Sequence, residues 1–105
     1  MESINAERRF VAATGLVSRR IGGDTILVPF TSGVGDLDAI YTLSEVGSRV
    51  WSMIQAPCSL TTIGTTLASE YDVSEDEAIR DALAFIDELA SKRLVLERSE
   101  EHTSE

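Results

Sequence analysis

The chain has 105 residues, 43% of them hydrophobic and 26% charged, and a formal net charge of -9; a length in this range fits one small domain with a single core. The acidic balance disfavours nucleic-acid partners, because phosphate backbones attract Lys and Arg rather than Asp and Glu. The sequence has neither an apolar run of about eighteen residues nor an apolar signal region at the N-terminus, so we expect a cytoplasmic protein with no membrane partner.

Strands are expected in the N-terminal third of the chain. Leu16–Ile21 is rich in β-forming residues, Gly22–Asp24 is typical of a turn, and Thr25–Phe30 reads as the returning strand of a hairpin. Pro29 cannot donate to a ladder, so it belongs at a strand end, at a bulge or on the side facing away from a partner. Leu37–Leu43 alternates in polarity and is predicted to be an exposed edge strand. Its apolar face consists of Leu37, Ala39, Tyr41 and Leu43.

Two capped amphipathic helices come next in the chain. Ser44 is the predicted N-cap of a helix that runs to about Gln55, and Ser59 caps a second helix that reaches Glu70 or Tyr71. The predicted core stripe of the first helix is Val46, Val50, Met53 and Ile54. On a neighbouring face lie Gly47, where a backbone can approach closely, and Trp51, which we expect to be a core residue.

A third helix opens with a capping box formed by Ser74 and Glu77, and it should end near Lys92-Arg93. Its predicted core stripe is Ile79, Leu83, Ile86 and Ala90. A second apolar strip, flanked by Asp81 and Lys92, consists of Ala78, Ala82, Phe85 and Leu89. A face this wide exceeds what one core contact needs, so the second strip either packs on the sheet or lines a groove for a partner. The residues alone favour packing.

The two ends of the chain fall outside the predicted domain. We expect a flexible N-terminal segment over residues 1–15 and a domain over residues 16–97. Residues 98–105 resemble the translation of a sequencing adapter, and a disordered acidic tail is the alternative. Removing their three Glu and one Arg changes the formal charge from -9 to -7, so the domain stays acidic.

Residue types with catalytic or metal-binding chemistry are scarce. Cys58 is the lone cysteine and His102 the lone histidine, so the chain cannot form an internal disulfide, a zinc cluster or a Cys/His nucleophile pair. Adjacent carboxylates such as Asp87 and Glu88 point in different directions on a helix and imply no acid/base pair. We therefore expect a non-catalytic chain without a cofactor or a metal ion.

Three segments, at the spacing of a known family, carry a resemblance. They are Tyr41-Thr-Leu-Ser-Glu-Val-Gly-Ser-Arg-Val-Trp51, Glu70-Tyr-Asp-Val-Ser-Glu-Asp-Glu-Ala78 and Asp81-Ala-Leu-Ala-Phe-Ile-Asp-Glu-Leu89. Together they resemble the PqqD family, which includes coenzyme PQQ synthesis protein D and the precursor-recognition domains of ribosomally synthesised, post-translationally modified peptides (RiPPs). The resemblance covers Val17 to Leu96. The chain departs from the family pattern at two places. One is Arg93, where a glycine commonly ends the third helix in that family, and the other is the strand that contains Pro29.

The resemblance implies an α+β, winged-helix-like fold in which a three-stranded antiparallel sheet is followed by three helices. It implies that the leader of a precursor peptide adds a strand to the third strand, with the third helix as the other wall of the groove. The peptide-binding residues it implies are Asp38, Ala39, Ile40, Tyr41, Thr42, Ala78, Asp81, Ala82, Phe85, Leu89 and Lys92. It also implies a separate modifying enzyme as partner, such as a radical SAM enzyme or a peptidase. For Phe85, the resemblance places the groove interpretation above plain packing.

Two other functions stay open at this stage. A winged-helix DNA-binding module is disfavoured because acidic residues crowd the start of the would-be recognition helix, namely Glu75, Asp76, Glu77 and Asp81. Arginines in the N-terminal region form a modest basic patch, which a solvated strand face explains: Arg8, Arg9, Arg19 and Arg20. The other alternative is a docking subunit whose apolar strip packs on a larger protein or on a second copy.

Overall fold

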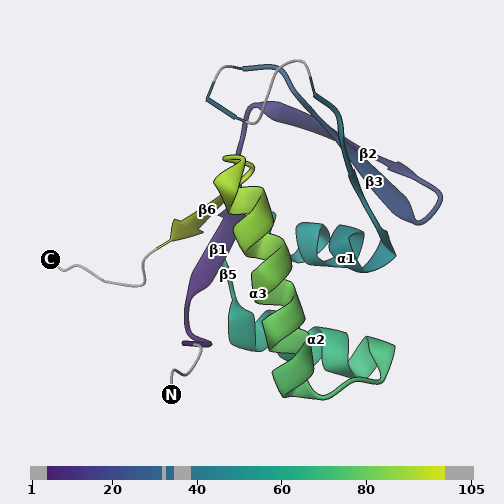
Figure 1. Cartoon of the computed structure of the whole chain (residues 1–105), viewed down its shortest axis with the longest axis vertical. Coiled ribbons are helices and arrows are strands. Elements are labelled where there is room, and N and C mark those ends of the chain that lie inside the picture. Colours follow the sequence, from purple (N-terminus) through teal and green to yellow (C-terminus); the bar gives the residue numbers. More distant parts are fainter. Residues whose placement is uncertain (1–4, 32, 35–38, 99–105) are drawn as a thin grey trace, which may run out of the picture.

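The computed structural model describes residues 5–31, 33–34 and 39–98. Its elements in chain order are β1 (Arg9–Ala12), β2 (Leu16–Ile21), β3 (Asp24–Pro29), β4 (Tyr41–Leu43), α1 (Glu45–Met53), β5 (Cys58–Ser59), α2 (Leu60–Tyr71), α3 (Glu75–Ser91) and β6 (Val95–Arg98). Figure 1 shows the β2–β3 hairpin at one end of the molecule, over α1, while α3 packs against α2 and β6. None of the described helices is long and apolar enough to cross a membrane.

The wing sheet, which we define as β2, β3 and β4, is antiparallel throughout. Its hairpin pairs Leu16 with Pro29 and Ile21 with Asp24, and Gly22 has a φ of 64°, which suits a tight turn. The predicted hairpin is confirmed. Pro29 is the last residue of β3, one of the positions that a residue without an N–H tolerates.

β4 is shorter than the predicted strand Leu37–Leu43. Strand geometry begins only at Tyr41, which pairs with Leu27, while Ala39 and Ile40 precede the strand and residues 35–38 lie outside the described residues. Continuing this register would place Ala39 opposite Pro29, whose nitrogen has no hydrogen to donate. The ladder therefore has a physical reason to stop near Tyr41.

A second sheet was not predicted. In the described residues β1 is its central strand, between β5 and β6, and Phe10 is only 2% exposed. The expectation of a flexible segment over residues 1–15 is therefore wrong for Arg9–Ala12, and Arg98, assigned to the tail, pairs with Arg9 at the end of β6. This pairing joins opposite ends of the chain, so no local pattern reveals it. Residues 99–105 lie outside the described residues.

All three predicted helix caps are confirmed. The side chains of Ser44, Ser59 and Ser74 each accept a hydrogen bond from the backbone N–H three residues later. Helix α1 ends at Met53, two residues before the expected end, with Ile54 as its C-cap. The first turn of α3 is acidic, which matches the positive N-terminal end of its dipole.

Helix α3 ends in a Schellman motif built on Arg93. The N–H of Leu94 donates to the carbonyl of Leu89 at 2.9 Å, and the N–H of Arg93 donates to that of Ala90 at 2.9 Å. Arg93 has a φ of 64°, the left-handed conformation that glycine adopts most easily. The helix thus stops where the sequence predicts, although an arginine occupies the glycine position.

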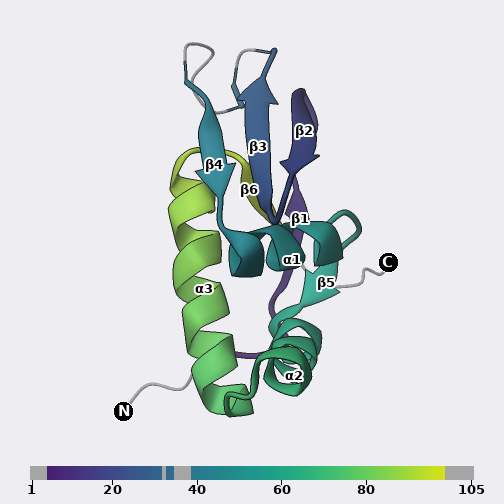
Figure 2. The ribbon, with the colours of Figure 1, turned by 90° about the vertical axis from the view of Figure 1, so that its right-hand side faces the viewer.

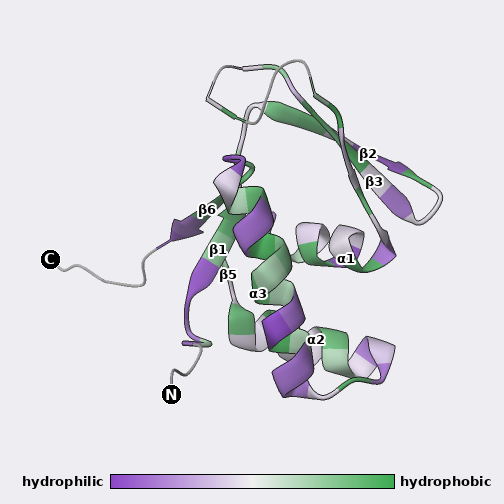
Figure 3. Ribbon diagram, viewed as in Figure 1, coloured by the Kyte–Doolittle hydropathy of each residue, from purple (hydrophilic) through white to green (hydrophobic). Residues whose placement is uncertain are grey.

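The core is formed by the helices together with residues from both sheets. Two predicted helix faces are wrong in part. In α1, Val46 is 42% exposed, whereas Gly47 and the core-predicted Trp51 are buried. In α3 the buried residues are Ala78, Ala82, Ile86 and Leu89, while Ala90 is exposed. The reason is that α3 is covered from two sides, so residues from both of its apolar strips are needed for packing. Figure 3 shows the resulting alternation of hydrophobic and hydrophilic turns along α3.

Candidate functional site

The candidate site lies between the edge of the wing sheet and α3. In the described part of the chain β4 is the last strand of its sheet, and Figure 2 shows it on the side of the sheet where α3 runs. Thr42 in this strand is exposed, and so is Ile40 just before it. Such an edge offers backbone groups to an added strand.

The ring of Phe85 connects α3 to α1 directly below β4. A β-carbon placed on Gly47 would lie 2.9 Å from Cε1 and 3.0 Å from Cζ of this ring, and 3.4 Å from Cβ of Leu43. A close approach at Gly47 is therefore present, but an aromatic ring makes it and not the backbone that was predicted. Phe85 is half-buried, so part of its ring faces solvent.

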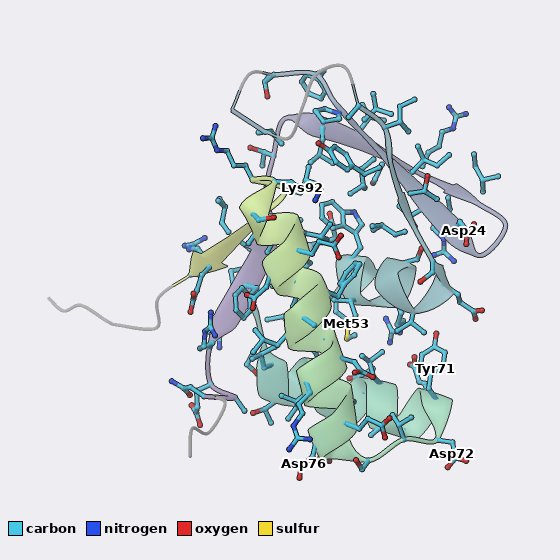
Figure 4. All side chains as sticks on the ribbon, in the orientation of Figure 1. Asp24, Met53, Tyr71, Asp72, Asp76 and Lys92 are labelled. Atoms are coloured by element: carbon cyan, nitrogen blue, oxygen red, sulfur yellow. The ribbon has the colours of Figure 1, made fainter. Side chains whose placement is uncertain are left out.

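Two neighbouring hollows continue from this point along α3. The first hollow has a volume of about 130 Å³ and is lined by Ser44, Val46, Gly47, Val50, Leu67, Asp81, Ala82 and Phe85. The second hollow, of about 110 Å³, is lined by Val46, Leu67, Tyr71, Val73, Ala78 and Asp81. The side chain of Tyr71 points from the end of α2 toward α1 in Figure 4. Because the hollows share Val46, Leu67 and Asp81, they form one apolar trough between α1 and α3.

Two comparisons with known proteins found a match, one to a family model and one to a solved structure. The family model for Coenzyme PQQ synthesis protein D (PqqD) matches residues 26–95. The chain belongs to the PqqD family. A solved structure described as "TbiB1 in Complex with the TbiA(beta) Leader Peptide" is similar at a TM-score of 0.69 and 26% sequence identity, over 90% of this chain and 99% of that one. No match was found among curated proteins.

The trough of this PqqD-family domain contains only some of the residues expected to bind peptide. Asp81, Ala82 and Phe85 line the first hollow, and Ala78 and Asp81 line the second. Leu89, 5% exposed, lies in the core, and Lys92 is exposed at the end of α3 nearest the wing sheet (Figure 4). Near β4, Ala39 and Tyr41 are half-buried, and Asp38 lies outside the described residues.

Sequence reasoning missed the contribution of α1 and of the end of α2 to this PqqD-family trough. Val46 lines both hollows but was assigned to the core, and Val73 was given no role. Helical spacing groups Val46 with Val50 and cannot distinguish a buried stripe from its exposed margin. The Gly47 position was the available signal, because a small residue on an apolar face marks a close contact.

Two ion pairs outside the trough form structural contacts between elements. Arg49 donates to Glu70 at 2.9 and 3.0 Å, which joins α1 to α2 and holds the pKa of the Glu70 carboxyl below its usual range. A similar pair joins Arg8 to Glu97 and lowers the pKa of Glu97. Burial raises the pKa of the Cys58 thiol, the opposite of what an activated nucleophile requires.

Proposed function

We propose that this PqqD-family domain is a non-catalytic adaptor that captures the leader segment of a ribosomally synthesised precursor peptide and presents it to a separate modifying enzyme. The observation that carries this proposal is the position of β4, a sheet edge that borders an apolar trough on α3. Family membership and the similarity to a chain solved with a leader peptide support it.

The proposed binding mode is strand addition. An extended leader would pair its backbone with β4 and its approach near Asp38–Thr42, which supplies affinity with little dependence on sequence. Alternate leader side chains would face α3, where Phe85, Ala82 and Asp81 would supply selectivity, with Ala78 and Lys92 toward the two ends. Leu89 is 5% exposed and packs in the core, so it would support the groove from within the core and would not contact the leader directly.

The proposed role of leader binding is to raise the local concentration of the core peptide at the modifying enzyme. A leader held by the domain keeps the attached core peptide near a modifying enzyme that binds the same domain, so a weak encounter becomes an intramolecular one. By the family resemblance, that enzyme would be a radical SAM enzyme or a peptidase. We place this work in the cytoplasm, where ribosomally made peptides are released. Affinity would be micromolar to submicromolar, on the order of 8 to 9 kcal/mol, because a disordered leader loses conformational entropy on docking.

Backbone methylation of the leader tests strand addition without altering the protein. The probe is a fluorescein-labelled leader from a precursor gene beside the gene for this chain, measured by fluorescence anisotropy, with each amide N-methylated in turn. Because successive residues in a strand point their N–H groups in opposite directions, we expect a large loss of affinity at every second position of the paired stretch.

Two outcomes would contradict the proposal. Saturable binding in which N-methylation has no alternating effect along the leader would exclude strand addition. Binding of random duplex DNA in preference to the leader would contradict the expectation that this acidic chain does not bind nucleic acid. Hydrogen exchange gives an independent check, since the amides of Thr42 and its neighbours should gain protection when the leader binds.

A further inference from the structure

The trough continues beyond the end of β4, and this continuity limits which part of a leader enters it. β4 ends at Leu43, and the next residues, Ser44, Val46 and Gly47, already line the first hollow. Every pair in the wing sheet is antiparallel, so an added strand that continues this pattern begins beside Leu43. The residues just N-terminal to the paired stretch then lie over the two hollows.

The spacing of the α3 residues that line the two hollows is close to that of alternate side chains in an extended peptide. Ala82 lines the first hollow and Ala78 the second, and these residues are one helical turn, or about 6 Å, apart. In an extended chain, side chains at positions i and i+2 point the same way and lie about 6.7 Å apart. Each hollow, at about 130 and 110 Å³, is also smaller than the roughly 300 Å³ at which small-molecule sites begin. The dimensions therefore fit two side chains of one peptide.

The charge of the trough comes from Asp81. This residue lines both hollows and is exposed, and its side chain makes neither a hydrogen bond nor an ion pair within the described ranges. At 100° per residue, Glu77 and Glu88 project from the same side of α3. None of the remaining lining residues of the two hollows is an Asp, Glu, Lys or Arg. A cationic group on the peptide is therefore favoured beside the hollows, and Lys92 marks the opposite end of the helix.

We infer that the leader segment recognised by this chain contains two apolar side chains at positions i and i+2, with a Lys or Arg between or next to them, N-terminal to the stretch that pairs with β4. The inference rests on the proposed function and names the class of peptide that the site selects. The apolar pair fills the two hollows, and the cationic side chain pairs with Asp81 at their shared rim.

A peptide library tests the inference without knowledge of the natural leader. The probe is a library of displayed, fully randomised 12-residue peptides, sorted at low salt for binding to the full chain. We expect enrichment of an apolar pair at i and i+2 together with an adjacent Lys or Arg. Enrichment of peptides without this pattern, or no enrichment at all, would overturn the inference.

Charge reversal tests the pairing with Asp81. When the library is sorted for binding to the Asp81→Lys variant, the enriched charged residue should change from Lys or Arg to Asp or Glu. We expect a preference of about fivefold for the acidic residues, which declines as the salt concentration rises. The matched control is Asp87→Lys, which carries the same change on a different side of α3 and should retain the original preference. An unchanged preference in Asp81→Lys would overturn the charge assignment.

Val46 gives a test of the hollows that leaves the core intact, since its side chain is 42% exposed. Val46→Gln should lower the affinity for an enriched peptide by about three- to tenfold, because one wall of both hollows becomes polar. Val17→Gln is the control, since Val17 is an apolar residue of β2, 52% exposed and outside both linings. Equal effects in the two variants would overturn the assignment of the hollows.

N-methylation of the enriched peptide separates this inference from the proposed function. Alternating sensitivity on the C-terminal side of the apolar pair is expected. Alternating sensitivity to N-methylation on the N-terminal side of the apolar pair would contradict an antiparallel arrangement of the peptide along β4 and so overturn the inference, while strand addition itself would stand. A natural leader that shows alternation but lacks the apolar pair would overturn the inference and leave the proposed function intact.

Discussion

The ring of Phe85 lies against the backbone of Gly47, so that α3 and α1 meet directly below the end of β4. A β-carbon on Gly47 would lie 2.9 Å from the nearest ring carbon, closer than such contacts ordinarily are. The glycine therefore determines where the ring sits, and the ring forms part of the wall of the first hollow. Packing and the proposed recognition of the leader therefore depend on the same contact.

Gly47→Ala should weaken leader binding while changing stability little. The new methyl group displaces the ring of Phe85, which is half-buried, and the resulting loss is partly offset because alanine is a better helix former than glycine, by at most about 1 kcal/mol at this first-turn position of α1. The displaced ring then partly fills the first hollow. We expect a melting temperature within a few degrees of that of the parent chain and a weaker anisotropy titration.

Gly64→Ala is the matched control, because it adds the same methyl group at another helix contact. There the β-carbon would meet Ile79 Cγ1, close to the α3 backbone, and a backbone carbonyl of Glu75 lies 3.5 Å away. Overpacking at this site should cost about 1 to 3 kcal/mol of stability. If Gly47→Ala lowers stability as much as Gly64→Ala, the ring of Phe85 is not free to move.

Phe85→Ala should weaken leader binding, whereas Glu97→Ala should leave binding unchanged. Glu97 lies on β6 and pairs with Arg8, outside the trough, so it controls for general effects of substitution. Because Phe85 is half-buried, its truncation should also cost about 2 kcal/mol of unfolding free energy. Urea unfolding of both variants is therefore needed to separate lost stability from lost binding. Phe85→Leu keeps more of the packing than Phe85→Ala, so it should restore the unfolding free energy more fully than the affinity for the leader. Equal affinities for the two alanine variants would remove Phe85 from the site.

Arg93→Gly should stabilise the chain by about 1 kcal/mol, because Arg93 holds a left-handed conformation that costs a residue with a side chain roughly that much. Chemical denaturation at moderate salt measures the effect and screens the favourable position of a cation at a helix end. Arg93→Ala is the control, since alanine removes the charge but keeps the strain, and it should be no more stable than the parent. A similar gain in both variants would show that charge, not backbone conformation, matters at this position.

The helices could be predicted from the sequence because their signals are local. Ser44, Ser59 and Ser74 each mark a helix start through a hydrogen bond to a backbone amide three residues away, and the spacing of apolar residues indicates the helix beyond each cap. The β2–β3 hairpin is local in the same sense. The second sheet is not, since Phe10 pairs with Glu97 across most of the chain and β5 has only two residues.

The candidate site could be predicted only in outline. Alternation and helical spacing indicate an edge strand and a second apolar strip on α3, but the family resemblance, not the spacing, assigned Asp81, Ala82 and Phe85 to a peptide groove. Which margin of an apolar helix stays exposed depends on the rotation of the helix against its neighbours, and that is a tertiary property. Val46 was therefore assigned to the core, although it lines both hollows.

Acid should remove the contribution of the Arg8–Glu97 pair, which joins the residue just before β1 to β6 through contacts of 2.9 and 3.0 Å. The hydrogen bond from Arg8 holds the pKa of Glu97 below its ordinary value of 4.5, so the pair stabilises the fold above that pH and the contribution is lost as pH falls through the lower, folded-state value. Both side chains are substantially exposed, at 33% and 47%, so the effect should stay below about 1 kcal/mol.

The comparison of Glu97→Gln with the parent chain isolates this pair, because the titration of every other carboxyl cancels between the two proteins. Urea unfolding should show a difference in stability at pH 7 that shrinks as the pH falls through the lowered, folded-state pKa of Glu97, and that is smaller at high salt. Glu88→Gln serves as the control, since Glu88 forms no ion pair in the part of the chain that the structure describes. A difference for Glu97→Gln that does not change with pH would mean that the glutamate acts through packing and not through its charge.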